Sequence, residues 1–287
     1  MRHQRAHPHD SRPPPPVTGF HAGGSGTPVV LLHGVTATWR VWSPVIPFLE
    51  ERHSVFAPTL PGHCGGESLA FEAPVTVAAL FDRLAAELDR RQIERAHLVG
   101  NSLGGWLALE LARRGRARSV VVFGSAGAWS SERRVRALAA GMRLAFATSR
   151  RCSRWADPIA ARRGLRTMFL GAQVAYPDQV PAEELAASIR SCLDAPAVVP
   201  LLRSITAQPF QPLPAEAGRP IRVVWAQRDK ILPFEHYGRP LLDRLPGAEL
   251  VRAPGIGHVP TWDAPAWVAG QILEVAGMAD AGERSDA

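Results

Sequence analysis

The sequence is poor in cysteine and has no long uninterrupted apolar run. Its three cysteines, Cys64, Cys152 and Cys192, lie far apart, a pattern that suits neither a disulfide framework nor a metal site. No apolar run reaches the roughly 20 residues that a membrane-spanning helix needs, so we expect no membrane span. The first residues lack the apolar core of a signal peptide. Because unpaired cysteines suit a reducing compartment, we predict a cytoplasmic protein.

Lysine is also scarce, so arginine supplies almost all of the positive charge, and the formal net charge is +7 at pH 7. Such a balance is compatible with nucleic acid, a membrane surface or an acidic ligand. The sequence has no nucleic-acid recognition motif and no basic stripe interleaved with aromatic residues. We therefore interpret the arginines as a solvated surface and expect no nucleic-acid partner. The pattern leaves the oligomeric state open.

The 287 residues are enough for one large domain, and 46% of them are apolar and 21% charged, as in an ordinary globular protein. Residues 1–16 are polar and end in a proline run, so we predict a disordered N-terminal tail. The histidines of this tail reflect its composition and do not predict a metal site. Residues 277–287 are polar, and we predict a frayed C-terminal tail there.

Short apolar runs that are typical of buried strands alternate with segments that carry apolar residues at helical spacing. The expected strands are residues 28–32, 54–57, 96–99, 119–123, 221–226 and 249–253, and the expected helices include residues 76–91, 103–114 and 265–276. This alternation predicts a parallel sheet with helices on both faces. Residues 128–214 instead carry arginine-rich helical stretches, at residues 132–148, 160–170 and 182–193, with no convincing strand. We interpret them as a helical insertion.

The motif GNSLGG at residues 100–105 places Ser102 between an expected strand and an expected helix. It fits the pattern G-x-S-x-G of a nucleophile elbow, which needs this strand-turn-helix context. Gly100 and Gly104 have no Cβ that would clash with the neighbouring strand and helix. The alternative is an ordinary strand-helix junction in which Ser102 caps the helix. The context favours the nucleophile.

A serine nucleophile needs a base that removes its proton. In this arrangement the base is a histidine that follows the serine and the acid in the chain. Only His236 and His258 follow Ser102. His258 lies in a loop just after the last expected strand, from which its ring can reach the edge of the sheet. His236 lies at an expected helix start, so we predict His258 as the base.

The base in turn needs an acid that orients it, at the carboxyl end of a strand. Asp229 follows the expected strand at residues 221–226 and meets this condition. Asp243 lies on an expected helix, and Asp263 is too close in sequence to His258. We predict Asp229 as the acid, and the alternative for Asp229 is a helix cap or a surface ion pair.

Attack on an acyl carbon creates an oxyanion, which preorganised N–H donors must stabilise. The first predicted donor is the amide of Leu103, at a helix N-terminus whose dipole also favours negative charge. The second is the amide of Val35, in the loop after His33 and Gly34. We expect His33 to hold this loop by hydrogen bonds and to take no part in catalysis.

The segments HGV, GNSLGG, AQRDKILP and GIGHVPTWDAP, in this order, resemble the α/β-hydrolase superfamily. The resemblance covers roughly residues 17–276 and is closest to cap-bearing serine esterases and to carbon–carbon hydrolases of ring-cleavage products. It implies an α/β-hydrolase fold with a mostly parallel eight-stranded sheet, helices on both faces and a helical cap inserted after the sixth strand. The implied core is residues 17–127 and 215–276, and the implied cap is residues 128–214. It places Ser102, Asp229 and His258 at the nucleophile, acid and base positions.

The sequence therefore predicts a serine hydrolase of the carboxylesterase kind, which cleaves an ester of a small, largely apolar molecule through an acyl-enzyme on Ser102. This chemistry needs no cofactor and no metal. A carbon–carbon hydrolase with the same triad is an alternative, although those enzymes usually have more glycine after HG than Val35-Thr36-Ala37 supplies. A ligand sensor with slow turnover is another. An Asp-dependent epoxide hydrolase or dehalogenase does not fit a serine nucleophile. We predict that tryptophans beside the expected active-site edge line the substrate pocket, namely Trp39, Trp42, Trp129 and Trp262, although ordinary packing explains each equally well.

Overall fold

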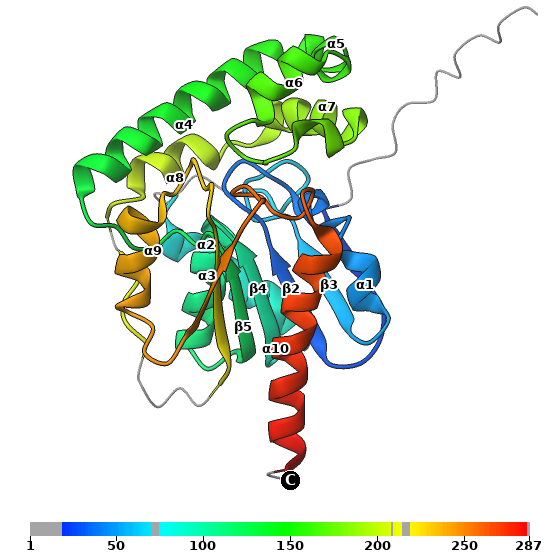
Figure 1. The fold of residues 1–287 in the computed structure, drawn as a ribbon, viewed down its shortest axis with the longest axis vertical. Helices are drawn as coiled ribbons and strands as arrows, with labels where there is room; N and C mark the ends of the chain where they lie inside the picture. The colour runs from blue at the N-terminus through cyan, green and yellow to red at the C-terminus, as the bar shows by residue number, and fades with distance from the viewer. Residues whose placement is uncertain (1–18, 70–74, 208, 214–218, 286–287) are drawn as a thin grey trace, which may run out of the picture.

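A computed structural model describes residues 19–69, 75–207, 209–213 and 219–285, and the tail predicted for residues 1–16 lies outside this range. The described residues form a seven-stranded sheet in the order β1-β3-β2-β4-β5-β6-β7 (Figure 1). Its strands pair in parallel, except that β1 is antiparallel to β3. The carboxyl ends of the parallel strands therefore meet at one edge of the sheet. The strands are β1 (Phe20–Gly23), β2 (Pro28–Leu32), β3 (Ser54–Pro58), β4 (Ala96–Asn101), β5 (Ala117–Phe123), β6 (Ile221–Ala226) and β7 (Glu249–Ala253).

All the strands that the apolar runs predict are present, but the expected total of eight strands is wrong for the described part of the chain. The additional strand, β1, pairs with β3 at the edge of the sheet. Its residues alternate between exposed and half-buried, so it has no buried apolar run by which the sequence could reveal it. Gly24 and Gly26 follow it with φ of +73° and +109°, values that a turn of this kind takes most easily at glycine.

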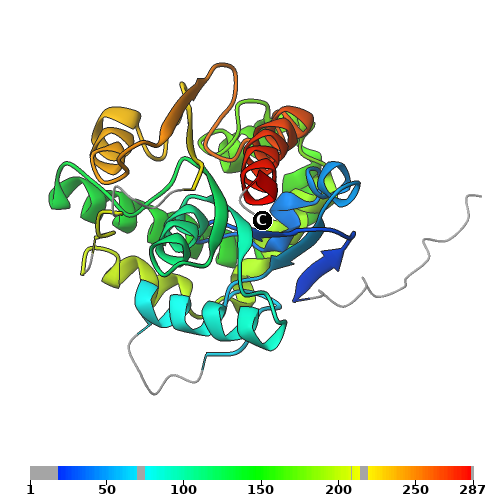
Figure 2. The same cartoon turned by 90° about the horizontal axis from the view of Figure 1, so that it is seen from below.

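Helices pack on both faces of the sheet, as the alternation of segments predicts. Successive strand side chains point to opposite faces, so Val30 and Leu32 enter one apolar core while Val29 and Leu31 enter the other. The first core includes residues of α2 (Val77–Arg90), α3 (Leu103–Arg113) and α9 (Phe234–Leu242), and the second includes residues of α1 (Ile46–Glu50) and α10 (Pro265–Ser285). Figure 2 shows α10 and α2 on opposite sides of the sheet.

A further layer of helices follows β5 and lies over the carboxyl edge of the sheet (Figure 1). It contacts the loops after β3 and β7, because the Ala197 N–H donates to the Gly62 carbonyl at 3.0 Å and the Val259 N–H to the Gln173 carbonyl at 2.8 Å. The insertion follows the fifth described strand, so its expected place after the sixth is wrong for the strands seen here. That this layer is a separate cap domain of residues 128–214 stays a prediction. Its helices are α4 (Glu132–Cys152), α5 (Ala156–Ala161), α6 (Arg163–Leu170), α7 (Ala182–Ser191) and α8 (Val198–Ser204).

The helices of this layer differ from the prediction in two places. The stretch predicted as one helix at residues 160–170 is divided between α5 and α6, because Arg162 adopts an extended conformation with φ −99° and ψ 117°. Helix α8 is not predicted, since Pro200 in its first turn obscures the helical pattern although proline is tolerated there. Among the described residues, no helix is by itself long and apolar enough to cross a membrane. The bent pair Ala182–Asp194 and Val198–Ser204 passes that test together, on length and composition alone.

Helix α10 continues to Ser285, so the frayed tail predicted from residue 277 is wrong for the described residues. Asp280 accepts hydrogen bonds from Thr27 Oγ1 at 3.0 Å and from Arg118 Nη2 at 3.2 Å. Glu283 forms ion pairs with Arg118 and, at 3.3 Å, with Arg95. These tertiary contacts hold the helix through its polar end, where sequence composition alone favours fraying.

Candidate active site

Ser102 occupies the sharp turn between β4 and α3. Its backbone has φ 56° and ψ −116°, a conformation that is strained for any residue other than glycine. A Cβ added to Gly104 would collide with the Leu32 carbonyl, so the close approach of α3 to β2 requires glycine at this position. The Ser102 hydroxyl makes no capping hydrogen bond to α3, so the alternative of a helix-capping serine is wrong. A strained turn with an uncapped hydroxyl is the geometry of a nucleophile elbow.

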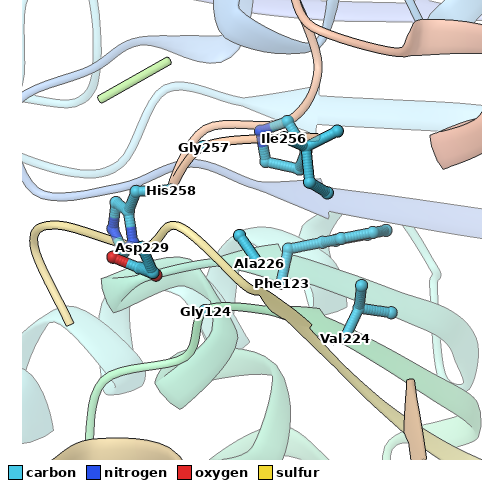
Figure 3. A pocket seen from close by; sticks show the side chains of 9 residues that line it. Phe123, Gly124, Val224, Ala226, Asp229, Ile256, Gly257 and His258 are labelled. Carbon is cyan, nitrogen blue, oxygen red and sulfur yellow. Dashed lines mark hydrogen bonds and ion pairs between the residues drawn. The ribbon is translucent and has the colours of Figure 1, made fainter. Parts of the chain in front are cut away.

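His258 and Asp229 meet from the loops after β7 and β6. His258 Nδ1 lies 2.8 Å from Asp229 Oδ2, and Figure 3 shows the ring beside the carboxylate. The other Asp229 oxygen accepts from the backbone N–H groups of Ile231 at 2.9 Å and Leu232 at 2.7 Å, so the carboxylate is fixed. A carboxylate only accepts hydrogen bonds, so His258 donates through Nδ1 and keeps Nε2 as the nitrogen that can take a proton. His236, in contrast, lies on α9 with its Nδ1 3.5 Å from Ser130 Oγ.

Asn101 ties the Ser102 turn to the loop that carries His258. Its Nδ2 donates to the carbonyl oxygens of Phe123 at 2.9 Å and His258 at 2.8 Å. Gly124 lies against both side chains of the pair, because an added Cβ would be 2.9 Å from Asp229 Oδ2 and 3.0 Å from His258 Nδ1. The ends of β4 and β5 therefore meet the loops after β6 and β7 at one place. The sequence predicts no role for Asn101, and its position inside the GNSLGG motif is the signal that could have revealed one.

The two predicted oxyanion donors lie next to the serine. The Leu103 amide is the first of α3, where the helix dipole adds positive character. Gly34 precedes Val35, and a Cβ added to Gly34 would lie 3.4 Å from the Ser102 Cβ. Within the described residues, neither the Val35 N–H nor the Leu103 N–H has a hydrogen-bond acceptor. Their action as oxyanion donors stays a prediction.

Two buried histidines hold the loop that carries Val35. His33 Nδ1 donates to the Gly34 carbonyl at 2.8 Å, and its Nε2 accepts from the Leu60 N–H at 2.8 Å. His63 Nε2 lies 2.8 Å from the Val35 carbonyl oxygen. Burial lowers the pKa of His33 to about 3 and also lowers the pKa of His63. Both rings are therefore neutral at pH 7, and the hydrogen bonds give His33 the loop-holding position that the sequence predicts.

Asp263 joins the loop of His258 to the helical layer. Its carboxylate accepts from the backbone N–H groups of Ala175 at 2.9 and 3.0 Å, Tyr176 at 3.0 Å and Gly257 at 2.8 Å. Ala175 and Tyr176 lie between α6 and α7, and Gly257 directly precedes His258. The sequence sets Asp263 aside as the acid of a triad, and its carboxylate indeed binds backbone amides. The sequence could not predict that Asp263 links these two segments, because two of its hydrogen-bond partners lie far away along the chain.

The tryptophans predicted to line a substrate pocket pack against apolar cores. Trp42 is fully buried, so its predicted place in a pocket wall is wrong. Trp39 packs against the core under α1 and α10, and Trp262 packs against the core of the helical layer. The Trp129 ring centroid lies 6.3 Å from that of Trp106. Trp39, Trp129 and Trp262 are half-buried, and their contact with a substrate stays a prediction.

A small cavity lies beside the His258 loop (Figure 3). Asp229 and His258 line it together with apolar side chains that include Phe123, Val224 and Ile256. Ser102 is not among its lining residues.

Comparison with known proteins assigns the chain to a family. It matches the Alpha/beta hydrolase family over residues 29–271. The epoxide hydrolase EphH of Mycobacterium tuberculosis is 35% identical over 223 residues, which are 69% of this chain and 92% of that protein. A 2-hydroxy-6-oxo-2,4-heptadienoate hydrolase of Pseudomonas putida is 39% identical over 94 residues, which are 31% of this chain and 33% of that protein. The chain thus spans about a third of the second relative.

Solved structures show the same fold. A thermophilic esterase from Thermogutta terrifontis has a TM-score of 0.68 and 22% identity, over 91% of this chain and 93% of that one. A meta-cleavage product hydrolase from Pseudomonas fluorescens has a TM-score of 0.68 and 18% identity, over 91% of this chain and 94% of that one. At such identities the likeness concerns the fold, and the family match covers most of the chain. The chain is therefore a hydrolase of the alpha/beta hydrolase family.

Proposed function

We propose that the chain is a serine hydrolase that cleaves a carboxylic ester of a small, largely apolar molecule through an acyl-enzyme on Ser102. The observation that carries this proposal is the 2.8 Å hydrogen bond between His258 Nδ1 and Asp229 Oδ2. The loop of this pair is bonded through its His258 carbonyl to Asn101, the residue before the strained Ser102 turn. An oriented His258–Asp229 pair, whose loop is bonded to the residue before a strained serine turn, supports nucleophilic catalysis by serine.

In the first half-reaction, His258 Nε2 takes the proton of the Ser102 hydroxyl as its oxygen attacks the ester carbonyl carbon. The carbonyl oxygen becomes an oxyanion, and the amides of Val35 and Leu103 stabilise it. Removing one such donor costs about 10²–10³ in rate. The imidazolium of His258 then gives its proton to the leaving alkoxide as the bond between the acyl carbon and that oxygen breaks, which leaves the acyl group on Ser102.

In the second half-reaction, His258 takes a proton from water, and the resulting hydroxide attacks the acyl carbon of the Ser102 ester. The imidazolium returns this proton to the Ser102 oxygen as the carboxylic acid leaves. Asp229 holds the Nδ1–H in place throughout and stabilises the imidazolium. Loss of the equivalent orientation in a comparable triad costs about 10⁴ in kcat. These steps use only side chains and backbone amides of the chain.

Two other reactions are suggested by the names of relatives. Carbon–carbon hydrolysis of a ring-cleavage product, as in the Pseudomonas putida relative, would use the same three residues, but the loop after Gly34 is poorer in glycine than that reaction usually has. Epoxide hydrolysis, suggested by the Mycobacterium tuberculosis relative, fits Ser102 poorly. A serine oxygen that opened an epoxide would form a stable ether, whereas a carboxylate nucleophile forms an ester that water can cleave.

The test compares the wild type with Ser102→Ala on activated short-chain esters, a ring-cleavage dienoate and a small epoxide. We expect ester hydrolysis by the wild type and a fall of at least about 10³-fold in kcat/KM for the variant. Ser125→Ala is the matched control, because Ser125 is a second buried serine near the site, whose hydroxyl donates to the Ala126 carbonyl at 2.9 Å. Equal ester hydrolysis by Ser102→Ala and wild type would refute the proposal. Rapid labelling of Ser102 by a fluorophosphonate without turnover would favour a ligand sensor.

We further place the enzyme in the cytoplasm, with a small ester-like molecule as its partner. The three cysteines, Cys64, Cys152 and Cys192, are all free thiols, which supports a reducing compartment. Fractionation of cells that produce the chain should recover the esterase activity with cytoplasmic markers. Recovery with secreted or envelope proteins would contradict this placement.

A further inference from the structure

Three side chains of metal-binding type meet at the edge of the sheet opposite Ser102. His53 directly precedes β3, His97 lies at the start of β4, and Asp280 lies near the end of α10. One possible ligand atom from each lies within 4.8 Å of the other two. Because β3 and β4 run parallel within the sheet, their first residues lie away from the edge that carries the nucleophile turn. The proposed ester hydrolysis uses none of these three residues.

The Nε2 atom of His97 faces the carboxylate of Asp280 inside the protein. The residue is only 1% exposed, and its Nδ1 lies 2.9 Å from Ser119 Oγ. Its Nε2 lies 3.2 Å from Asp280 Oδ1, yet it has no hydrogen-bond partner in the part of the chain that the structure describes. Leaving a buried polar atom unsatisfied is unfavourable. A buried ring nitrogen that faces a carboxylate oxygen at 3.2 Å, without good hydrogen-bond geometry, is placed to share a cation with that oxygen.

Hydroxyl groups of neighbouring residues form hydrogen bonds with His53, His97 and Asp280 and so orient them. Thr27 Oγ1 donates to Asp280 Oδ2 at 3.0 Å and lies 2.9 Å from His53 Nδ1, so one side chain orients two of the three. Ser119 does the same for His97. The His53 and His97 rings stand edge to face, with centroids 5.4 Å apart. Such outer partners fix the ring nitrogens and carboxylates that bind metals in proteins.

We propose that His53, His97 and Asp280 bind one divalent transition-metal ion, and that Zn²⁺ fits best. Two imidazoles and one carboxylate are a ligand set that Zn²⁺ accepts, with water at the fourth tetrahedral position. With metal–ligand bonds of about 2.0–2.1 Å, neighbouring ligand atoms in a tetrahedral site lie about 3.3 Å apart. The 3.2 Å between His97 Nε2 and Asp280 Oδ1 already matches this spacing. Binding then draws the third ligand inward from a separation of at most 4.8 Å.

Arg118 limits the strength of the site. Its Nη2 donates to Asp280 Oδ1 at 3.2 Å, and it also pairs with Glu283. The guanidinium orients the carboxylate, but its positive charge repels a cation. The ion would link the end of α10 to the starts of β3 and β4, so its effect is on stability and not on ester chemistry. Arg118→Gln should therefore bind Zn²⁺ several-fold more tightly than its parent.

The test starts from a full-length chain with His3→Asn, His7→Asn and His9→Asn, so that no imidazole of the N-terminal segment contributes to the measured metal binding. This parent is stripped with a chelator and then titrated with Zn²⁺ by calorimetry, and its Tm is measured with and without the metal. We expect one Zn²⁺ per chain and a higher Tm in its presence. Co²⁺ in place of Zn²⁺ should give the intense visible absorption of a tetrahedral site.

Variants in this parent locate the ion. Asp280→Asn and His97→Gln should each weaken Zn²⁺ binding by at least about 100-fold, and Thr27→Val, which removes an outer partner, by about 10–100-fold. His236→Gln is the control, since this histidine lies on α9, and it should leave the affinity unchanged. If His97→Gln fails to fold, the Zn²⁺ affinity of Asp280→Asn decides the test, because asparagine keeps the shape of the Asp280 side chain. A parent that binds no Zn²⁺, or an Asp280→Asn variant that binds as tightly as the parent, overturns the proposal.

Discussion

Replacing Asp263 by Asn should loosen the tie between the His258 loop and the helical layer. In the wild type, both carboxylate oxygens accept from backbone amides, and one of them binds the Gly257 N–H at 2.8 Å. An Asn side chain keeps one oxygen and turns an NH₂ donor toward the remaining amide donors. At least one of the hydrogen bonds must therefore be lost.

The size of the stability loss depends on which of these backbone amides can form a hydrogen bond with water instead. Gly257 is buried and Ala175 half-buried, whereas Tyr176 is exposed, so only the first two lose a partner that solvent does not replace. A hydrogen bond to a charged group contributes about 1.5–3 kcal/mol. Losing one such bond and weakening a second should lower the free energy of unfolding by about 2–4 kcal/mol.

The catalytic rate should reveal a displaced His258 loop, independently of any change in the free energy of unfolding. Misplacement by about 1 Å can cost about 10²-fold in rate, so Asp263→Asn should lower kcat for an activated ester by about 10- to 100-fold, with a smaller change in KM. Urea unfolding measures the stability of the same samples. Because the expected effect is on the base, the pH profile of kcat should also shift, which a purely structural loss would not produce.

Glu184→Gln provides the matched control. Glu184 on α7 accepts from Arg40 Nε at 3.0 Å, so this pair also joins the helical layer to the core but does not touch the His258 loop. The Arg40 side chain is 41% exposed, so water partly screens this ion pair, and the variant should lose only about 1 kcal/mol and keep the wild-type kcat. The reasoning is refuted if both variants have the same kcat, or if Asp263→Asn is less stable but fully active.

Two further changes test the support of the site. The folded pKa of His33 is about 3 against 6.5 for the free side chain, so the unfolded chain binds a proton that the folded chain excludes. Stability should therefore fall as the pH drops from 6.5 toward 3, by up to about 5 kcal/mol, and urea unfolding of His33→Gln should show a flatter dependence. Gly124→Ala should lower kcat at least about 10-fold, because its Cβ would lie 2.9 Å from Asp229 Oδ2 and its φ is +49°. Gly141→Ala, where the added Cβ meets open space, should keep full activity, and equal kinetics of the two variants would contradict the account.

The parallel core of the sheet could be predicted because its strands are buried on both faces. Residues such as Val29 to Leu32 then form an unbroken apolar run, which the sequence displays directly. The edge strand β1 could not be predicted, since its residues are exposed or half-buried and β3 is the one strand that it pairs with in the described sheet. The end of α10 could not be predicted either. Its helix depends on contacts of Asp280 with Thr27 and Arg118, which exist only in the folded chain.

The candidate site also has parts that the sequence predicts and parts that it does not. The pairing of Asp229 with His258 agrees with the prediction from motif order and strand ends, while their action on Ser102 stays a proposal. Asn101 and Asp263 were missed because their partners are backbone groups from distant segments. Every residue carries a backbone carbonyl and nearly every residue a backbone N–H. No sequence motif can therefore mark the particular backbone groups that bind Asn101 and Asp263. The cluster of His53, His97 and Asp280 was missed for a related reason, since the sheet and α10 unite residues whose spacing resembles no metal motif.

The most direct test of the central claim is to locate the acyl group during turnover. The wild type is mixed with excess activated ester, quenched in acid within the first turnovers, digested and mapped by mass spectrometry. The account predicts a burst of released alcohol close to one equivalent per chain and an acyl adduct on Ser102. Steady ester turnover with the adduct on another residue, or undiminished turnover by Ser102→Ala, would contradict it.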